Sequence, residues 1–310
     1  MKKLSIICPI YNENKTIELF YSRVKPIIDN LKTKKIEPYL IFINNGSSDD
    51  SFNIIKSIIK KTKNVSIITL SRNFGYQNSL FFSLQKIVSD LYIFIDVDCE
   101  DPPELILNFI NELNSDVDIV YGERIDREES FILKKFRNLF YKITKFLADE
   151  EIILYMAEFC LFTKEVRDAI INENNSFPFI RSSIGRIGFN RKKITYKRSK
   201  RIAGKTNYNL FNMFIFAIAG ILSSTTIFLR IPIYLFPFLT LFFLVSIYYN
   251  LYLGNSFYLE IFFNVAILFI SYSVSFICIY LARVYKNILQ RPNAYIKKEK
   301  TIINKNIIYD

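Results

Sequence analysis

An almost charge-free stretch in the second half of the chain restricts the fold more than any other feature of the sequence. Residues 207–282 contain only two charged side chains, Arg230 and Glu260, whereas charged residues are frequent on both sides. Residues 231–259 and 261–282 are each long enough for a helix of roughly 20 apolar residues, the length that crosses the hydrocarbon core of a bilayer. The sequence therefore predicts a water-soluble front part followed by a membrane-embedded part.

Basic segments on both sides of this stretch predict its orientation. Lysines and arginines concentrate at 181–205 and 283–305, and the positive-inside rule places both segments in the cytoplasm, which requires an even number of crossings. A third span over 207–229 would leave too few residues for a reversal before the next one, so we interpret 207–230 as a helix lying in the membrane interface. We accordingly expect a multi-pass protein of the cytoplasmic (inner) membrane, with a globular domain over 1–206, two transmembrane helices over 231–283 and a basic cytoplasmic tail over 284–310.

Strand-like and helix-like segments alternate in the front part. Short runs rich in Val, Ile, Tyr and Phe predict strands, and their near-continuous apolar character is typical of a parallel sheet covered on both faces. The segments between them have helical spacing, which predicts a doubly wound α/β sheet whose ligands lie at the carboxyl ends of the strands. An amphipathic segment at 131–147 predicts a helix that either faces the core or rests on the membrane surface. The expected strands are 4–10, 39–44, 65–70, 91–96 and 117–122, and the expected helices are 15–32, 50–62, 76–89 and 103–114.

The residue types present exclude several classes of chemistry. The chain has no histidine, which excludes Ser–His–Asp and Cys–His mechanisms and histidine-ligated metals. Its four cysteines are far apart, so neither a zinc site nor a disulfide framework is indicated. The formal net charge is +12, but the basic segments border the apolar stretch, where they suit lipid headgroups and phosphate better than nucleic acid. We therefore expect carboxylates and basic residues to carry the chemistry, and no nucleic-acid partner.

The segment LYIFIDVDCEDPPE at 91–104 carries the strongest indication of a site. An apolar strand ends in Asp96-Val97-Asp98, which places two carboxylates near the carboxyl edge of the sheet. Hard oxygen ligands of this kind can hold Mg²⁺ or Mn²⁺ on a diphosphate. The alternative is an acidic loop and helix cap without a metal.

Three earlier loops are expected to converge on the same edge. The segments CPIYNENKTI at 8–17, IFINNGSSDDS at 41–51 and SRNFGYQNSL at 71–80 each lead from a strand through polar residues into a helix. Any one of them could be an ordinary strand–helix connection. Because the carboxyl ends of parallel strands meet at one edge, three such loops beside the Asp96-Val97-Asp98 segment favour a shared binding site.

Together these segments resemble family 2 glycosyltransferases of the GT-A fold and, more closely, the polyprenyl-phosphate glycosyltransferases. The resemblance rests on P-x-Y-N-E at 9–13, N-G-S-x-D at 45–49, S-R-N-F-G at 71–75, D-x-D-x-x-D-P-P-E at 96–104, Y-G-x-R at 121–124, R-x-A-G-K-T at 201–206 and the terminal hairpin. It implies a metal-dependent, inverting transfer of a sugar from a nucleotide-sugar, by default a UDP-sugar, to a polyprenyl (undecaprenyl) phosphate at the cytoplasmic membrane face. We also expect a homo-oligomer.

The resemblance also implies a role for each matching residue. A catalytic role falls to Asp96, Asp98, Glu158 and Arg201, and the metal ligands would be Asp98 and Asp96. The nucleotide-sugar pocket would be lined by Pro9, Tyr11, Asn12, Glu13, Asn45, Asp49 and Asp96. The lipid phosphate or the donor diphosphate would be received by Arg124, Arg181, Arg201 and Lys205.

Two departures from the family pattern leave alternatives open. Asn45 stands where the family commonly has Asp, which puts the choice of nucleotide in doubt, and Ala157-Glu158 stands where it often has Gly-Asp. A non-catalytic membrane protein that retains the fold as a binding or scaffold module is therefore the alternative. A processive polysaccharide synthase is a weaker rival, because the Q-x-x-R-W motif of that group needs a tryptophan and this chain has none.

Overall fold

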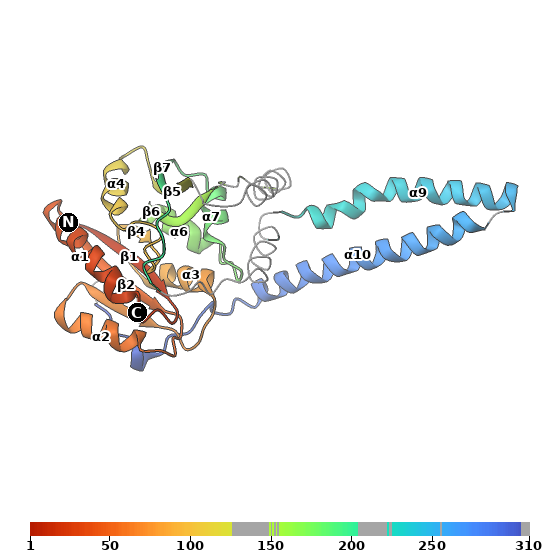
Figure 1. The fold of residues 1–310 in the computed structure, drawn as a ribbon. Helices are drawn as coiled ribbons and strands as arrows, with labels where there is room; N and C mark the ends of the chain where they lie inside the picture. The colour runs from red at the N-terminus through yellow and green to blue at the C-terminus, as the bar shows by residue number, and fades with distance from the viewer. Residues whose placement is uncertain are drawn as a thin grey trace.

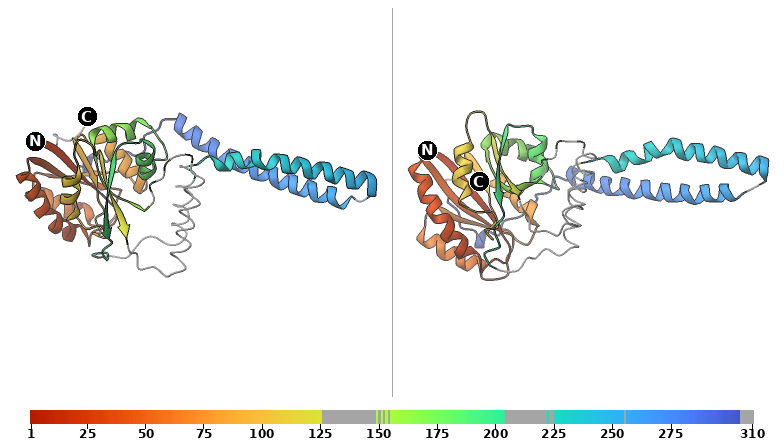
Figure 2. Two further views of the ribbon diagram at one scale, coloured as in Figure 1. Left: turned by 90° about the horizontal axis from the view of Figure 1, so that it is seen from above. Right: turned by 45° about the horizontal axis from the view of Figure 1, so that its top comes forward.

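The structure is a computed structural model that describes residues 1–125, 149, 151, 153, 155–203, 222, 225–254 and 256–304. It shows a globular α/β domain from which a long pair of helices projects (Figures 1 and 2). The predicted amphipathic segment 131–147, most of the predicted interfacial helix 207–230, and Lys205 lie outside the described residues.

A seven-stranded mixed sheet forms the centre of the domain, with strand order β3-β2-β1-β4-β6-β5-β7. β6 pairs antiparallel with both β4 and β5, whereas the other neighbouring strands pair in parallel. The strands are β1 (Lys2–Ile10), β2 (Ile36–Asn44), β3 (Val65–Thr69), β4 (Leu91–Phe94), β5 (Ile119–Ile125), β6 (Met156–Thr163) and β7 (Arg191–Lys197).

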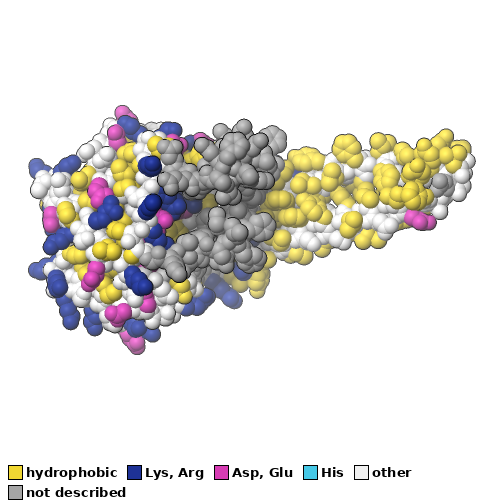
Figure 3. All heavy atoms as spheres, in the orientation of Figure 1, with side chains coloured by type: hydrophobic (Ala, Val, Ile, Leu, Met, Phe, Trp, Pro, Cys, Tyr) yellow, Lys and Arg dark blue, Asp and Glu magenta, His cyan; other side chains and the backbone are white. Residues whose placement is uncertain are grey.

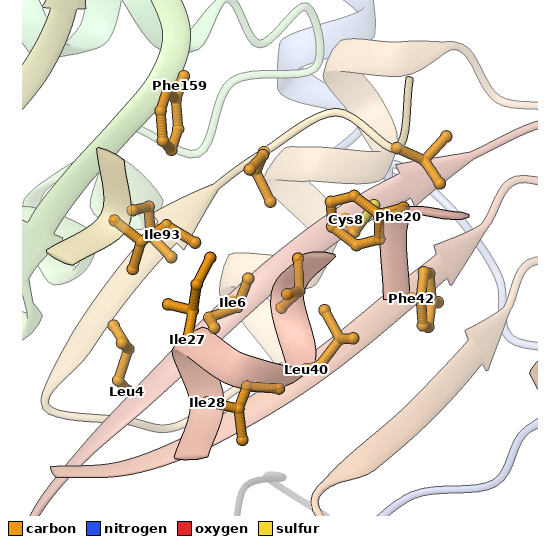
Figure 4. Packing of buried hydrophobic residues seen from close by; sticks show 14 of the residues in the cluster. Leu4, Ile6, Cys8, Phe20, Ile27, Ile28, Leu40, Phe42, Ile93 and Phe159 are labelled. Atoms are coloured by element: carbon orange, nitrogen blue, oxygen red, sulfur yellow. The ribbon is translucent and has the colours of Figure 1, made fainter. Parts of the chain in front are cut away.

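Helices cover both faces of the sheet, because side chains alternate between the two faces along each strand. In β2, Leu40 and Phe42 pack with α1, α2 and α4, and Ile41 packs on the opposite face with α3, α6 and α7. Figure 4 shows the first of these clusters, in which the rings of Phe20 and Phe42 meet edge to face with centroids 6.1 Å apart. The helices are α1 (Ile17–Thr33), α2 (Ser51–Lys61), α3 (Tyr76–Lys86), α4 (Leu105–Glu112), α6 (Lys164–Asn172) and α7 (Ile180–Arg186).

The predicted strands and helices of the first 125 residues are confirmed, with ends that differ by a few residues. The five predicted strands run parallel to one another as expected, but the sheet also contains β6, which the sequence did not reveal and which runs antiparallel to both of its neighbours. We missed β6 and β7 in the sequence. β7 is half exposed and carries Arg191, Lys192 and Lys193, so it lacks the apolar run by which the other strands were recognised.

Two apolar helices follow, α9 (Ile227–Leu253) and α10 (Phe257–Ile288). At about 1.5 Å per residue they extend ~40 Å and ~48 Å, more than the ~30 Å hydrocarbon core of a bilayer. Their large apolar side chains are exposed, and Figure 3 shows this apolar surface along the whole hairpin. Length and composition therefore make both helices candidate membrane spans.

The hairpin differs from the prediction at its ends. α9 begins at Ile227, so Arg230 lies inside this helix and pairs with Asp149, while Glu260 lies in the first turn of α10. The predicted basic tail also has structure. After α10 the chain returns to the globular domain, where Ile296 and Ile302 form antiparallel bridges with residues of the β3 edge.

Candidate active site

Asp96 and Asp98 follow β4 at the carboxyl edge of the sheet. Asp96 Oδ1 accepts a hydrogen bond of 2.8 Å from the hydroxyl of Tyr76, the first residue of α3. Asp98 Oδ1 accepts one of 3.1 Å from the backbone N–H of Glu100, and Asp98 Oδ2 lies 3.6 Å from Arg201 Nη1. The two carboxylates thus sit on a short turn that the strand and its neighbours hold in place.

Negative charge accumulates around these two aspartates. Burial, followed by the charges of Asp98 and Asp101, raises the pKa of Asp96 to about 7, although its side chain retains some solvent contact. Burial also raises the pKa of Asp98, and the guanidinium of Arg201 opposes that rise. A divalent cation would relieve this repulsion, and carboxylate oxygens are the ligands that Mg²⁺ and Mn²⁺ prefer.

The aspartate pair fits a metal that is shared with a ligand. Within the described ranges no group of three or more acidic or cysteine side chains is arranged to hold a metal ion. Asp96 and Asp98 would therefore supply only part of a coordination shell. Oxygens of a bound diphosphate or of water would have to complete it.

Arg201 is brought to the aspartates by the segment that follows β7. The backbone N–H groups of Ser199 and Ile202 donate to the carbonyls of Glu100 and Asp98, at 2.9 and 3.1 Å. The guanidinium of Arg201 also forms an ion pair with Glu13, from the loop after β1. Three segments that are distant in sequence therefore meet around one guanidinium.

Arg124 and Asp101 form a buried ion pair beneath this site. Both Nε and Nη2 of Arg124 donate to the carboxylate of Asp101, at 2.9 and 2.7 Å. Asp101 is 1% exposed and also accepts a hydrogen bond from the hydroxyl of Tyr196 in β7. A Cβ at Gly122 would lie 2.6 Å from the Tyr196 ring, so only glycine leaves room for this contact. We expected Arg124 to bind a phosphate of a substrate, but in the structure its guanidinium pairs with Asp101.

Glu158 lies in β6, opposite the end of β4. Phe94 pairs with Cys160, and two residues further along the two antiparallel strands come Asp96 and Glu158. Glu158 Oε1 accepts hydrogen bonds from Gln77 Nε2 at 2.8 Å and from Arg181 Nε at 2.7 Å. Glu158 Oε2 is buried and has no hydrogen-bond partner among the residues that the structure describes. This oxygen is therefore an acceptor that a ligand hydroxyl or amide could satisfy.

The loops after β1 and β2 form the side of the site expected to hold the nucleotide. Asn12, at a φ of 55°, accepts a hydrogen bond of 2.9 Å from the N–H of Ser48 through Oδ1. The carboxylate of Asp49 accepts from the N–H groups of Asn14 and Ser51, both at 3.1 Å. Asp49 therefore ties the two loops together. Of the other residues predicted here, Tyr11 is 40% exposed and Pro9 is buried inside β1.

Asn45 is bound by the loop that follows β3. Its Oδ1 accepts from the N–H of Phe74 at 2.9 Å, and its Nδ2 donates to Asn73 Oδ1 at 3.0 Å. Gly46 lies so close to this loop that a Cβ would stand 2.6 Å from the carbonyl carbon of Arg72, at a φ of +76°. The amide predicted to line the nucleotide-sugar pocket thus joins two loops of the site.

Four residues of the site were not identified from the sequence: Tyr76, Gln77, Asp101 and Tyr196. Tyr76 and Gln77 directly follow the S-R-N-F-G turn, at the start of a helix that opens at the site. Asp101 is the third aspartate of a motif that we had already singled out. The positions of Tyr76, Gln77 and Asp101 next to recognised motifs could have identified them as site residues. Tyr196 lies on β7, a strand that the sequence did not reveal.

Comparisons with known proteins agree with this geometry. A model of the glycosyl transferase family 2 matches residues 5–171, and the chain belongs to this family. It is therefore a glycosyltransferase, and its mixed sheet is that of the GT-A fold. The resemblance expected from the motifs is confirmed.

Individual relatives cover most of the chain. It is 30% identical over 309 residues to the bactoprenol glucosyl transferase of Shigella phage SfV, across 96% of this chain and 99% of that one. It is 32% identical over 234 residues to a prophage bactoprenol glucosyl transferase homolog of Escherichia coli, across 75% and 76%. An uncharacterized glycosyltransferase of Bacillus subtilis is 33% identical over 219 residues, across 70% and 67%.

Proposed function

We propose that this glycosyltransferase transfers a sugar from a nucleotide-sugar, by default a UDP-sugar, to undecaprenyl (bactoprenol) phosphate at the cytoplasmic face of the membrane. One observation supports this above the others. Arg201, on the segment that precedes the apolar hairpin in the chain, contacts both Asp98 and Glu13, so a basic side chain stands beside the paired aspartates. Relatives that match nearly the whole chain carry the name bactoprenol glucosyl transferase.

The reaction is a single displacement at the anomeric carbon. An oxygen of the lipid phosphate forms a new bond to that carbon while the bond to the donor diphosphate breaks, and the electron pair leaves with the nucleoside diphosphate. Attack from the opposite side inverts the configuration. The lipid phosphate is already ionised near neutral pH and needs little help from a general base, which fits a chain without histidine.

The residues of the site would then bind and orient the two substrates. Asp98 and Asp96 would hold Mg²⁺ or Mn²⁺, which neutralises charge on the departing diphosphate when bound. Arg201 would place positive charge between the diphosphate and the incoming lipid phosphate. Glu158, through its unpartnered oxygen, would accept a hydrogen bond from the sugar or the acceptor. Arg181 would orient that carboxylate through its 2.7 Å bond to Glu158 Oε1.

The apolar hairpin supports the proposed membrane placement. Two candidate spans return the chain to the side from which it left, so the basic residues around Arg201 and those after α10 would share the cytoplasmic side. The assignment to the inner membrane and the homo-oligomeric state are part of this proposal.

A transfer assay tests the proposal directly. The full chain in detergent would be supplied with undecaprenyl phosphate, Mg²⁺ or Mn²⁺ and a panel of radiolabelled donors that includes UDP-glucose, other UDP-sugars and GDP-mannose. We expect label in the extracted lipid with one UDP-sugar, and none when EDTA is present. Absence of transfer with every donor, while a nucleoside diphosphate still binds, would favour the scaffold alternative.

A further inference from the structure

The segment after the membrane hairpin lies along the open edge of the sheet. β3 is the edge strand, with β2 on one side. On its other side, the N–H of Ile67 donates to the carbonyl of Ile302 at 2.8 Å, and the reverse bond measures 2.9 Å. Further along, the N–H of Lys297 donates to the carbonyl of Thr69 at 2.7 Å. We call residues 293–304 the edge segment. In Figure 1 it runs from the end of α10 to the part of the domain that carries α2.

The edge segment reaches the loop that holds Asn45. The N–H of Ser71 donates to the carbonyl of Tyr295 at 2.8 Å, which fixes the start of the turn at 71–75. The ring of Tyr295 packs against the ring of Phe74, with centroids 6.1 Å apart. Phe74 in turn donates its N–H to Asn45 Oδ1. A short chain of contacts thus joins the segment to the side of the site expected to hold the nucleotide.

The same segment is anchored at the membrane end of the domain. Asn287, in the last turn of α10, accepts a hydrogen bond of 3.0 Å from the N–H of Ser176 through Oδ1. The chain then turns at Gln290, whose φ of 46° ends the helix. Asn293 Nδ2 donates to Asn78 Oδ1 in α3 at 3.2 Å and to the carbonyl of Asn175 at 3.1 Å. Few residues therefore separate the membrane helix from the turn at 71–75.

We infer that the edge segment contributes to the donor site. It holds the turn at 71–75 in the position that binds the nucleotide, and through Phe74 it holds the loop of Asn45 there as well. Tyr295 is the principal positioning residue. This inference rests on the proposed function insofar as the ligand is a nucleotide-sugar. It makes donor binding depend on residues that follow the membrane hairpin, far from every donor-site motif in the sequence.

The physical reason lies in the exposed edge of β3. An uncovered edge strand leaves a row of N–H and C=O groups without partners, and its end is free to move. The turn at 71–75 begins directly after that edge, so on the side away from β2 its position is defined only when the edge is paired. The lysines of the segment, such as Lys298, leave its outer side charged, which discourages pairing with another chain.

Substitution of Tyr295 gives a test with matched controls. The Tyr295 hydroxyl has no hydrogen bond in the described structure, so Tyr295→Phe keeps the contact with Phe74, whereas Tyr295→Ala removes it. Lys298→Ala alters the same segment at a side chain without such a contact. Loss of one aromatic pair changes an equilibrium constant by about two- to tenfold. We expect Tyr295→Ala to weaken UDP binding and raise the donor KM by about this factor, with the lipid KM unchanged.

A pair of proline variants tests the backbone pairing. Lys297→Pro removes the N–H that donates to Thr69, whereas Lys298→Pro enters the first position of a short 3₁₀ helix. Lys297 has φ −89° and ψ 93°, outside the α region that a following proline disfavours. We expect Lys297→Pro to behave like Tyr295→Ala, and Lys298→Pro to behave like the unaltered protein.

Hydrogen exchange provides a readout that needs no substrate. In the unaltered protein the amides of Ile67 and Ser71 should be protected, and Tyr295→Ala should speed exchange at Phe74 and Gly75. Exchange at Ile67 and Ser71 as fast as in an open strand would overturn the inference even if a variant failed to fold. Equal donor KM values for Tyr295→Ala and Lys298→Ala would also overturn it. Absence of transfer by the unaltered protein would instead count against the proposed function.

Discussion

Arg201 Nη1 lies 3.6 Å from Asp98 Oδ2, although the two residues are more than a hundred positions apart in the chain. The same guanidinium pairs with Glu13. The paired-aspartate turn and the basic segment before the apolar hairpin therefore lie in contact in the folded chain. The predictions below test what each part of the candidate site does.

Asp98→Ala should reduce sugar transfer by at least about 10²-fold, since loss of preorganised charge stabilisation has effects of this size. Asp29→Ala is the matched control, because Asp29 is an exposed aspartate whose ion pair in the described part of the chain is with the neighbouring Lys32. Transfer rates with purified protein, together with extraction of both variants from membranes, provide the measurement. Near-normal transfer by Asp98→Ala would remove the metal-site assignment.

Arg201→Ala should raise the KM for the lipid acceptor by about tenfold, as expected for the loss of one charge-assisted contact of about 1.4 kcal/mol. Arg201→Lys should recover only part of the effect, because an ammonium cannot contact Asp98 and Glu13 in the forked geometry of a guanidinium. The measurement is a titration of undecaprenyl phosphate at saturating donor. If acceptor dependence stays the same in both variants, Arg201 serves the internal ion pairs alone.

Asp101→Ala should destabilise the domain by about 3–5 kcal/mol, because it leaves the largely buried Arg124 without its partner. Tyr196→Phe removes a single hydrogen bond to the same carboxylate and should cost about 1 kcal/mol. Thermal unfolding of the detergent-solubilised protein compares the two. A midpoint for Asp101→Ala no lower than that for Tyr196→Phe would show that Arg124 finds water or another partner.

Asp96 should make stability depend on pH when divalent cations are removed. With a pKa of about 7, the folded protein keeps a proton that the unfolded chain, with its ordinary pKa of 3.8, has released. The free energy of unfolding should therefore fall as pH rises from about 4 to about 7, by up to ~4 kcal/mol from this group alone. Below and above this window the contribution of Asp96 is constant.

Unfolding midpoints at pH 5 and pH 8 in EDTA test this dependence. Asp96→Asn should lose that part of the pH dependence, because an amide does not titrate in this range. Mg²⁺ or Mn²⁺ should reduce the dependence in the unaltered protein by binding the ionised carboxylate. Identical profiles for the two proteins in EDTA would contradict the raised pKa.

Glu158→Gln should separate a role in the reaction from a role in packing. The substitution keeps an acceptor for Arg181 and Gln77, removes the charge of the carboxylate and replaces Oε2, the unpartnered oxygen, by an amide NH2 group that donates. If that oxygen contacts the substrates, we expect kcat to fall by at least about tenfold while UDP affinity stays within about twofold. An unchanged kcat would restrict Glu158 to holding Arg181.

Local features of the sequence determined much of this protein. The apolar run before Asp96 forms a strand because burial on both faces requires it, and the two carboxylates follow at its end. The almost charge-free stretch at 207–282 predicted the apolar hairpin, because two helices of such composition have no polar face to present to water. These conclusions depend on neighbours within a few positions, which is the range over which periodicity and turn residues act.

Only the tertiary structure decided which distant residues meet. β6 enters the sheet antiparallel between β4 and β5, which places Glu158 opposite Asp96, and no local pattern specifies that pairing. The partner of Arg124 proved to be Asp101, and the chain after the hairpin returned to cover β3. Such contacts form because buried charges and open strand edges must find partners somewhere in the folded molecule. Which partner is found depends on the path of the whole chain.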